Sequence, residues 1–273
     1  MASVSTVSDS IAIPPVADAS WLVQLIDRWI YVFMAVLLVT IVLVGFIPDS
    51  IGKIAAVERA ERPPFPVAMH LHAVLMGSWM LLLLTQTTLM ATGRRAMHMQ
   101  LGVAGMILAP ALVIAGVVLV PTNLQLWAAF GEAGPPAVQE GVQGFLHFMT
   151  NIALLQLRIA VCFLLMVYIG LRARKRDSGL HKRMMILATI APTPAAFDRM
   201  TFLPHTLPES PLTVDLWPLL AIAPMFLWDL YRQRSIHRAY WIYAAIMVPT
   251  AVVVHLLWDS PWWHAVAPGL LYR

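Results

Sequence analysis

The chain has 273 residues, of which 60% are hydrophobic and only 12% are charged. A soluble domain has about 25% charged residues, and a soluble fold of this size cannot bury so much apolar surface. The formal net charge of +4 does not indicate nucleic-acid binding, because the basic residues stand in short loops between apolar stretches. The composition therefore predicts an all-α, polytopic integral membrane protein whose main partner is the lipid bilayer.

A membrane span needs about 20 mostly apolar residues, and seven stretches meet that requirement. We expect one seven-helix transmembrane domain over 28–260, with an N-terminal tail (1–27) and a C-terminal tail (261–273). The first residues lack the basic start and the continuous apolar core of a signal peptide, so we interpret them as a cytoplasmic tail. The predicted spans are 29–47, 67–91, 101–121, 145–171, 184–204, 212–231 and 240–258.

The charge of the loops predicts the orientation of these spans. The loops after the second, fourth and sixth spans hold 11 of the 18 Lys and Arg residues, whereas those after the third and fifth hold none. Basic loops stay in the cytoplasm. The N-terminus is therefore predicted inside and the C-terminus outside, in the inner (plasma) membrane of a bacterium.

Four histidines are predicted at one level, near the outer face. His70 and His72 open the second span, His147 opens the fourth, and His255 lies in the last turn of the seventh. Imidazole suits Zn, Cu or Fe, including haem iron, and facing helices of a bundle can supply such ligands. We expect at least three of the four to converge on a metal ion (Fe, Cu or Zn) or a haem b. The alternative is that each histidine anchors its helix at the membrane interface.

The two histidines of the second span are two residues apart, which is about 200° around a helix. They cannot easily share one centre, and the sequence leaves open whether His70 or His72 faces inward.

A polar face follows His147 down the fourth span. Asn151 and Arg158 share that face by helical spacing, and Arg158 is about 16 Å deeper than His147 at 1.5 Å per residue. A guanidinium near mid-membrane stays charged and needs an acceptor, for which we expect Asp198 of the fifth span. Asn151, Arg158 and Asp198 are therefore predicted to hold the polar part of a cofactor; alternatively, Arg158 and Asp198 form a structural ion pair.

Two segments carry a resemblance to known proteins. The stretch HLHAVLMGSWMLLLLTQTTLMATGRRAMHMQLG, followed by LHKRMMILATI, resembles a group of uncharacterised bacterial membrane proteins with an outer histidine pair, and the likeness covers about half of the chain. The matching residues are His70, His72, Trp79, Gln86, Arg94, His98 and Gly102.

There is a looser similarity to b-type cytochromes and transmembrane ferric reductases, which implies a haem held between histidines of the bundle. The chain lacks the paired histidines within one helix that the two-haem members have, so at most one haem, on the outer side, is expected.

The prediction is a membrane protein with a His-rich metal or haem site near the non-cytoplasmic face, serving membrane redox chemistry. His72 and His147 are the first choice of ligands. Whether it is an enzyme, a metal- or haem-dependent oxidoreductase, is left open. A quinone or another lipophilic small molecule, and another membrane protein, are candidate partners.

Two rival functions stay open. One is a transporter or small-molecule binding protein that uses Asp198, Arg158 and the fifth span, which Pro192 and Pro194 interrupt. The other is a non-catalytic accessory subunit, in which the polar groups only satisfy one another.

Overall fold

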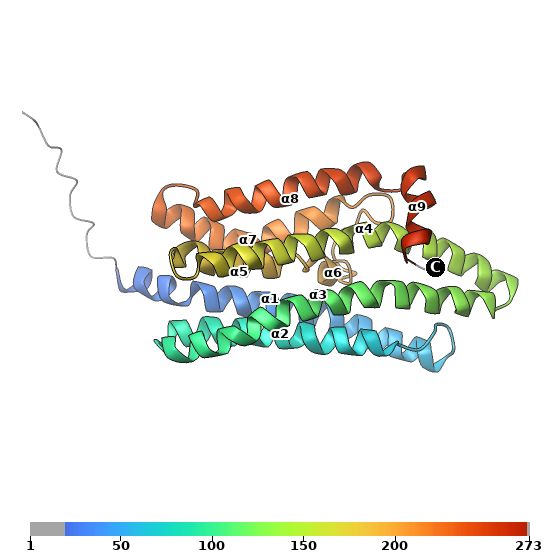
Figure 1. Cartoon of the computed structure of the whole chain (residues 1–273), viewed down its shortest axis with the longest axis horizontal. Coiled ribbons are helices and arrows are strands. Elements are labelled where there is room, and N and C mark those ends of the chain that lie inside the picture. Colours follow the sequence, from blue (N-terminus) through green and yellow to red (C-terminus); the bar gives the residue numbers. More distant parts are fainter. Residues whose placement is uncertain (1–19, 272–273) are drawn as a thin grey trace, which may run out of the picture.

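The computed structural model describes residues 20–271 and is helical there, with no strand in that part of the chain. The long helices run side by side along the longest axis of the molecule (Figure 1). The described helices are α1 (Trp21–Glu58), α2 (Val67–Ala91), α3 (Arg95–Glu132), α4 (Pro136–Ala173), α5 (Ser178–Ile190), α6 (Pro194–Phe197), α7 (Leu212–Gln233), α8 (Arg238–Leu257) and α9 (Pro261–Leu271).

Six of these helices are long and apolar enough to cross a membrane: α1, α2, α3, α4, α7 and α8. Many large apolar side chains point away from the bundle; Leu71, Val74 and Leu81, for example, are 53%, 66% and 64% exposed. A soluble monomer rarely exposes so much contiguous apolar surface. The expectation of a helical integral membrane protein is confirmed.

The fifth predicted span, 184–204, differs from the structure. α5 ends at Ile190, four residues of α6 follow, and no helix spans 198–211. Pro192 and Pro194 cause the break, because each removes a backbone N–H donor from the helix. α5 has 13 residues and is about 20 Å long at 1.5 Å per residue, less than the roughly 30 Å of the hydrocarbon core. The count of seven spans and the orientation of the termini stay predictions.

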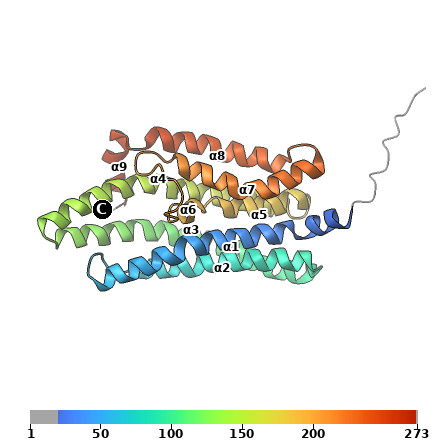
Figure 2. The same cartoon turned by 180° about the vertical axis from the view of Figure 1, so that it is seen from behind.

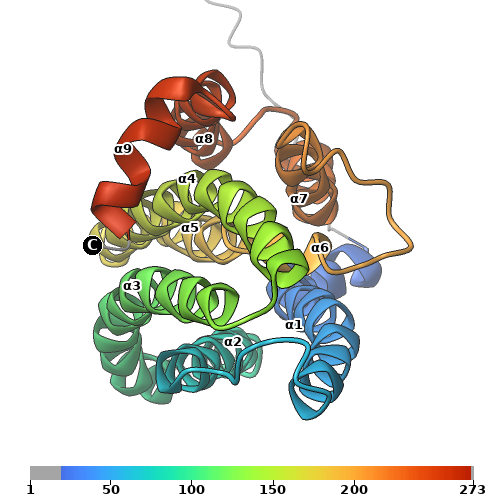
Figure 3. The same ribbon diagram turned by 90° about the vertical axis from the view of Figure 1, so that its right-hand side faces the viewer.

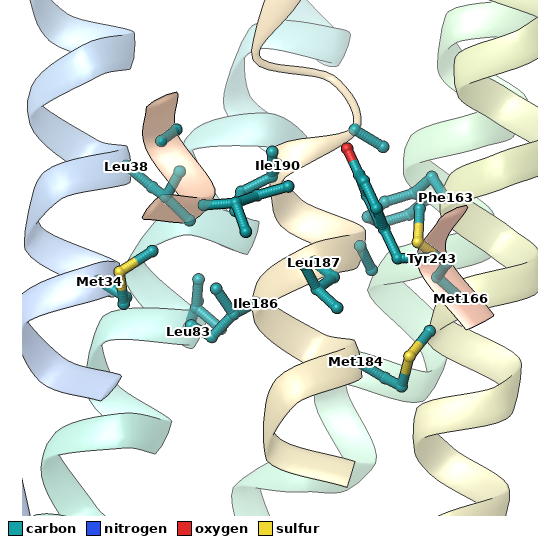
Figure 4. Packing of buried hydrophobic residues seen from close by; sticks show 14 of the residues in the cluster. Met34, Leu38, Leu83, Phe163, Met166, Met184, Ile186, Leu187, Ile190 and Tyr243 are labelled. Carbon is teal, nitrogen blue, oxygen red and sulfur yellow. The ribbon is translucent and has the colours of Figure 1, made fainter. Parts of the chain in front are cut away.

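α5 is nevertheless the centre of the bundle. Figure 3, viewed along the bundle, shows α4 and α5 in the middle, α2 and α3 on one side, and α7 and α8 on the other. The α5 side chains Met184, Leu187 and Ile190 are fully buried and pack against Met34 of α1 and Met166 of α4 (Figure 4). A helix that carries apolar side chains on all of its faces is suited to this enclosed position.

The bundle has two distinct ends, visible in Figures 1 and 2. We call one the basic end; it holds the start of α1 and the turns 92–94, 174–177 and 234–237, where the basic residues gather. We call the other the α9 end. There α9 lies within the predicted external tail and packs against α3 and α4.

Candidate metal centre and buried charge pairs

A cluster of three side chains with metal-binding chemistry lies at the α9 end. His147 Nε2 is 2.9 Å and His264 Nε2 is 3.0 Å from the same oxygen, Oδ1 of Asp259. The imidazole rings are stacked, with centroids 3.8 Å apart and an interplanar angle of 7°. One ligand atom from each residue lies within 4.8 Å of the other two, and residues 20–271 contain no other group of three His, Cys, Asp or Glu residues that does so.

The local chain geometry between α8 and α9 assembles this cluster. α8 ends at Leu257, and Asp259 has a φ of 55°, which reverses the chain direction; Asp tolerates this left-handed region better than most residues. Ser260 Oγ then accepts a hydrogen bond from Trp263 N (3.2 Å), and Pro261 occupies the first helical position, where its missing N–H costs nothing. His264 is thereby placed one turn into α9.

The same turn is fastened to α4 by hydrogen bonds. The backbone N–H of Asp259 donates to Asn151 Oδ1 (3.1 Å), and Asn151 Nδ2 donates to Asp259 Oδ1 (3.4 Å). Trp263 Nε1 donates to the Thr150 carbonyl (2.8 Å). Hydrogen bonds from His147, Asn151 and His264 hold the pKa of the Asp259 carboxyl below its usual 3.8. Asp259 is therefore an ionised carboxylate in a fixed position, as a metal ligand must be.

The structure does not gather the four predicted histidines. His147 joins the cluster above, but His70 is exposed and packs its ring edge-on to Phe65. His72 is half-buried beside Gly116 of α3, and its Nδ1 is buried with no hydrogen-bond partner in the described chain. The reason is that α2 packs chiefly against α1 and α3, away from α8. The metal-binding role of His70, His72 and His255 stays a prediction.

The expected partner of Arg158 was wrong. Its Nη1 atom is 2.5 Å from Asp215 Oδ1 at the start of α7, whereas Asp198 is exposed, just after α6. The break after α5 explains why Asp198 is not the partner of Arg158. Asp198 lies beyond α6 and not on a continuous helix that faces α4. His255 Nε2 lies 3.0 Å from the second oxygen of Asp215, so the fourth predicted histidine belongs to this pair.

A second buried charge pair, absent from the sequence predictions, lies nearer the basic end. Arg183 of α5 binds Asp229 of α7 with two bonds, from Nε (2.7 Å) and Nη2 (2.5 Å). The Tyr240 hydroxyl donates to the same carboxylate at 2.5 Å, and Arg183 Nη1 donates to the Gly179 carbonyl at 2.9 Å. Arg183 and Asp229 are 7% and 5% exposed.

Asp259 and His264 are the two cluster residues that sequence reasoning missed. The sequence did contain a signal, because Ser260 followed by Pro261 is a typical start of a helix. That signal predicts a further helix where we expected an external tail. Asp215 had a weaker signal, its position three residues into the predicted sixth span.

No protein-family model matches the chain, and neither a curated protein nor a solved structure is significantly similar to it. The resemblances noted above therefore stay predictions, and the functional argument rests on the chemistry of the residues themselves.

Proposed function

We propose that this membrane protein binds one transition-metal ion through His147, Asp259 and His264, and that the bound ion serves membrane redox chemistry. The observation that carries the proposal is the approach of three ligand atoms, one from α4 and two from the segment between α8 and the first turn of α9, to within 4.8 Å of one another. Two histidines and one carboxylate form the donor set of non-haem Fe(II) sites. Zinc sites use the same donor types, but zinc has no redox chemistry. Iron is therefore the candidate for the redox role, and binding of zinc alone would count against that role.

The spacing of the donors supports this assignment. Ligand atoms bound at about 2.1 Å in tetrahedral or octahedral geometry lie about 3.0–3.4 Å apart. The distances of 2.9 Å and 3.0 Å from Asp259 Oδ1 to the two imidazole nitrogens are close to that range. The two stacked rings would have to turn relative to each other for both nitrogens to point at one ion. Asn151 would hold this ligand in place, because its Nδ2 donates to the same Asp259 oxygen and its Oδ1 accepts from the Asp259 backbone N–H.

The position of the cluster supports access from outside the cell. The basic turns lie at the opposite end of the bundle, and basic loops stay in the cytoplasm, so the α9 end is proposed as the non-cytoplasmic face of a bacterial inner membrane. The side chains of His147 and Asp259 are 58% and 61% exposed. Three protein ligands would leave coordination positions for water or a substrate.

The competing explanation is a latch without metal, in which the same hydrogen bonds only fasten α9 to α4. The experiment is metal analysis of protein purified in mild detergent, stripped with a chelator and then titrated anaerobically with Fe(II) and, separately, with Zn(II). We expect one ion per chain for the wild type. His264→Ala and Asp259→Ala should lose stoichiometric binding.

The matched control is His205→Ala, since His205 is an exposed histidine whose Nε2 contacts only the Met200 carbonyl. This variant should bind metal like the wild type, with unchanged helix content by circular dichroism. Absence of a stoichiometric ion from the wild type, or normal binding by Asp259→Ala, would leave the latch as the explanation. A haem absorption band in the same sample would instead favour the haem prediction and move the test to His70, His72 and His255.

A further inference from the structure

A crevice lies between the last two long helices of the bundle. Side chains join α7 and α8 at two levels, because Tyr240 bonds to Asp229 near the basic end and His255 contacts Asp215 nearer the α9 end. Both helices also pack against α5, and α8 packs against α4. Figure 3 shows α7 and α8 on the side of the central pair α4 and α5 that is opposite α2 and α3. The floor of the crevice is formed by α4 and by Ala191 and Pro194, at the break that follows α5.

A cavity of about 200 Å³ lies in this crevice. Its walls are almost entirely apolar, and at its rim Leu219 of α7 and Val248 of α8 are 51% and 59% exposed. In a membrane-spanning helix those exposed positions meet lipid tails. The cavity is therefore accessible to a hydrophobic molecule arriving from within the bilayer.

One hydroxyl group in the cavity has no partner. Tyr243 lines the cavity and is only 7% exposed, and its hydroxyl makes no hydrogen bond with any residue of 20–271. In the view of Figure 4 its ring lies between Ile190 and Phe163, with the oxygen pointing away from Met184. The buried side-chain atoms without a partner in the described chain belong to His72, Gln86 and His98, so the Tyr243 oxygen is open to the cavity and not sealed in protein. A molecule in the cavity that carries a hydrogen-bond acceptor can therefore bond to this hydroxyl.

Arg158 adds further donor capacity without adding net charge. Its guanidinium has five N–H groups, of which three bond to Asp215, Thr250 and Met247. Asp215 balances its charge at 2.5 Å. The positive charge of Arg158 is therefore already balanced. A carboxylate ligand would lose its hydration on entering the cavity and would gain no unpaired positive charge in return. An uncharged hydrogen-bond acceptor fits better.

We propose that this cavity binds the ring of an uncharged, quinone-type lipid, with a ring carbonyl accepting a hydrogen bond from Tyr243. The free N–H groups of Arg158 complete the polar end, and the isoprenoid or alkyl tail leaves between Leu219 and Val248. The volume suits one substituted ring, since an apolar cavity of about 150 Å³ accepts benzene. This site is separate from the metal cluster and does not depend on it.

The test is equilibrium binding of a decyl-substituted benzoquinone to the full-length protein in mild detergent, with decanoic acid as the anionic comparison. We expect saturable binding of the quinone and weaker binding of the acid. Ala244→Leu, which places a larger side chain into the cavity wall, should weaken quinone binding at least tenfold. Tyr243→Phe, which keeps the shape of the ring, should weaken it about two- to tenfold, the loss of one neutral hydrogen bond.

The matched control is Ala245→Leu, because Ala245 is the next residue of α8, is exposed and does not line the cavity. It should bind the quinone like the wild type. The proposal is wrong if the quinone does not bind saturably, or if Ala244→Leu and Tyr243→Phe both bind it as tightly as Ala245→Leu. Preferential binding of decanoic acid would overturn the uncharged-ligand assignment.

Discussion

The two buried charge pairs of the bundle use the same residue types in opposite ways. In both, an arginine from a neighbouring helix meets an aspartate of α7, and a tyrosine of α8 is close by. We call Arg183–Asp229 the closed pair and Arg158–Asp215 the open pair.

The two pairs differ in what surrounds them. In the closed pair the carboxylate also accepts from Tyr240 and from Gln233, and no cavity adjoins it among those described. In the open pair the nearby tyrosine, Tyr243, bonds to nothing in the described chain and faces the cavity. Both arginines use three of their N–H groups inside the protein, and Asp215 also contacts His255. The pairs differ in the neighbouring tyrosine, which bonds to the carboxylate in the closed pair and opens onto the cavity in the open pair.

The largest expected effect comes from removing the acid of each pair. Asp229→Leu leaves Arg183 as an unpaired charge inside the bundle, and we expect the free energy of unfolding to fall by about 3–5 kcal/mol. Asp215→Leu should cost only about 1–3 kcal/mol, because Arg158 keeps its bonds to Thr250 and the Met247 carbonyl and the cavity can admit a compensating group. Titration with a denaturing detergent, followed by circular dichroism, measures both.

Equal losses for the two variants would erase the distinction between the pairs. The double variant Arg183→Leu/Asp229→Leu provides the control, because removing both charges should recover much of the stability that the single change loses.

The tyrosines give a smaller and sharper contrast. Tyr240→Phe removes a hydrogen bond to a charged carboxylate, which is worth about 1.5–3 kcal/mol. Tyr243→Phe removes a hydroxyl that has no partner, so in the absence of ligand its stability should match the wild type. The same unfolding titration compares them. A loss at Tyr243 as large as at Tyr240, in ligand-free protein, would show that both hydroxyls serve the scaffold.

The sequence was sufficient for the existence of the six long helices, because continuous apolar runs with a length near that of the bilayer have few other solutions. It did not predict their bounds: α1, α3 and α4 have 38 residues each and extend beyond the predicted spans 29–47, 101–121 and 145–171. It was insufficient for the fifth span. Pro192 and Pro194 were visible, but a kink and a complete break leave the same pattern in sequence. The prolines remove N–H donors in either case, and whether the helix bends or stops at Ile190 depends also on how α5 packs against α1, α4, α7 and α8.

Partners across helices were harder still to predict. Helical spacing correctly placed Asn151 and Arg158 on one face of α4, since both point toward the later helices. It could not rank Asp198 against Asp215 as the acceptor, because that choice depends on how distant helices rotate against α4. The same limit hid Asp259 and His264, whose approach to His147 depends on a single turn between α8 and α9.

The smallest predicted effect concerns the helix that carries the closed pair. Asp177 caps α5: its Oδ1 accepts from the Leu180 backbone N–H at 2.8 Å. Asp177→Ala should therefore cost about 1 kcal/mol and loosen the start of the helix that positions Arg183. Asp177→Asn is the matched control, since asparagine caps a helix about as well as aspartate.

The same residue gives a pH dependence with a defined sign. The Leu180 N–H and the Arg238 guanidinium lower the pKa of the Asp177 carboxyl from its usual 3.8. Because the pKa of Asp177 is lower in the folded protein than in the unfolded chain, its ionised form stabilises the fold. This stabilisation is fully present at a pH above the ordinary pKa, and it is lost as the pH falls through the lowered pKa of the folded protein. The stability difference between wild type and Asp177→Ala should therefore be full at pH 7 and shrink below about pH 4, whereas Asp177→Asn should keep its margin over Asp177→Ala. If the stability difference between wild type and Asp177→Ala is the same at pH 3 as at pH 7, the charge of the carboxylate does not contribute to the cap. The cap of α5 would then add no charge-dependent term to the stability of the closed pair.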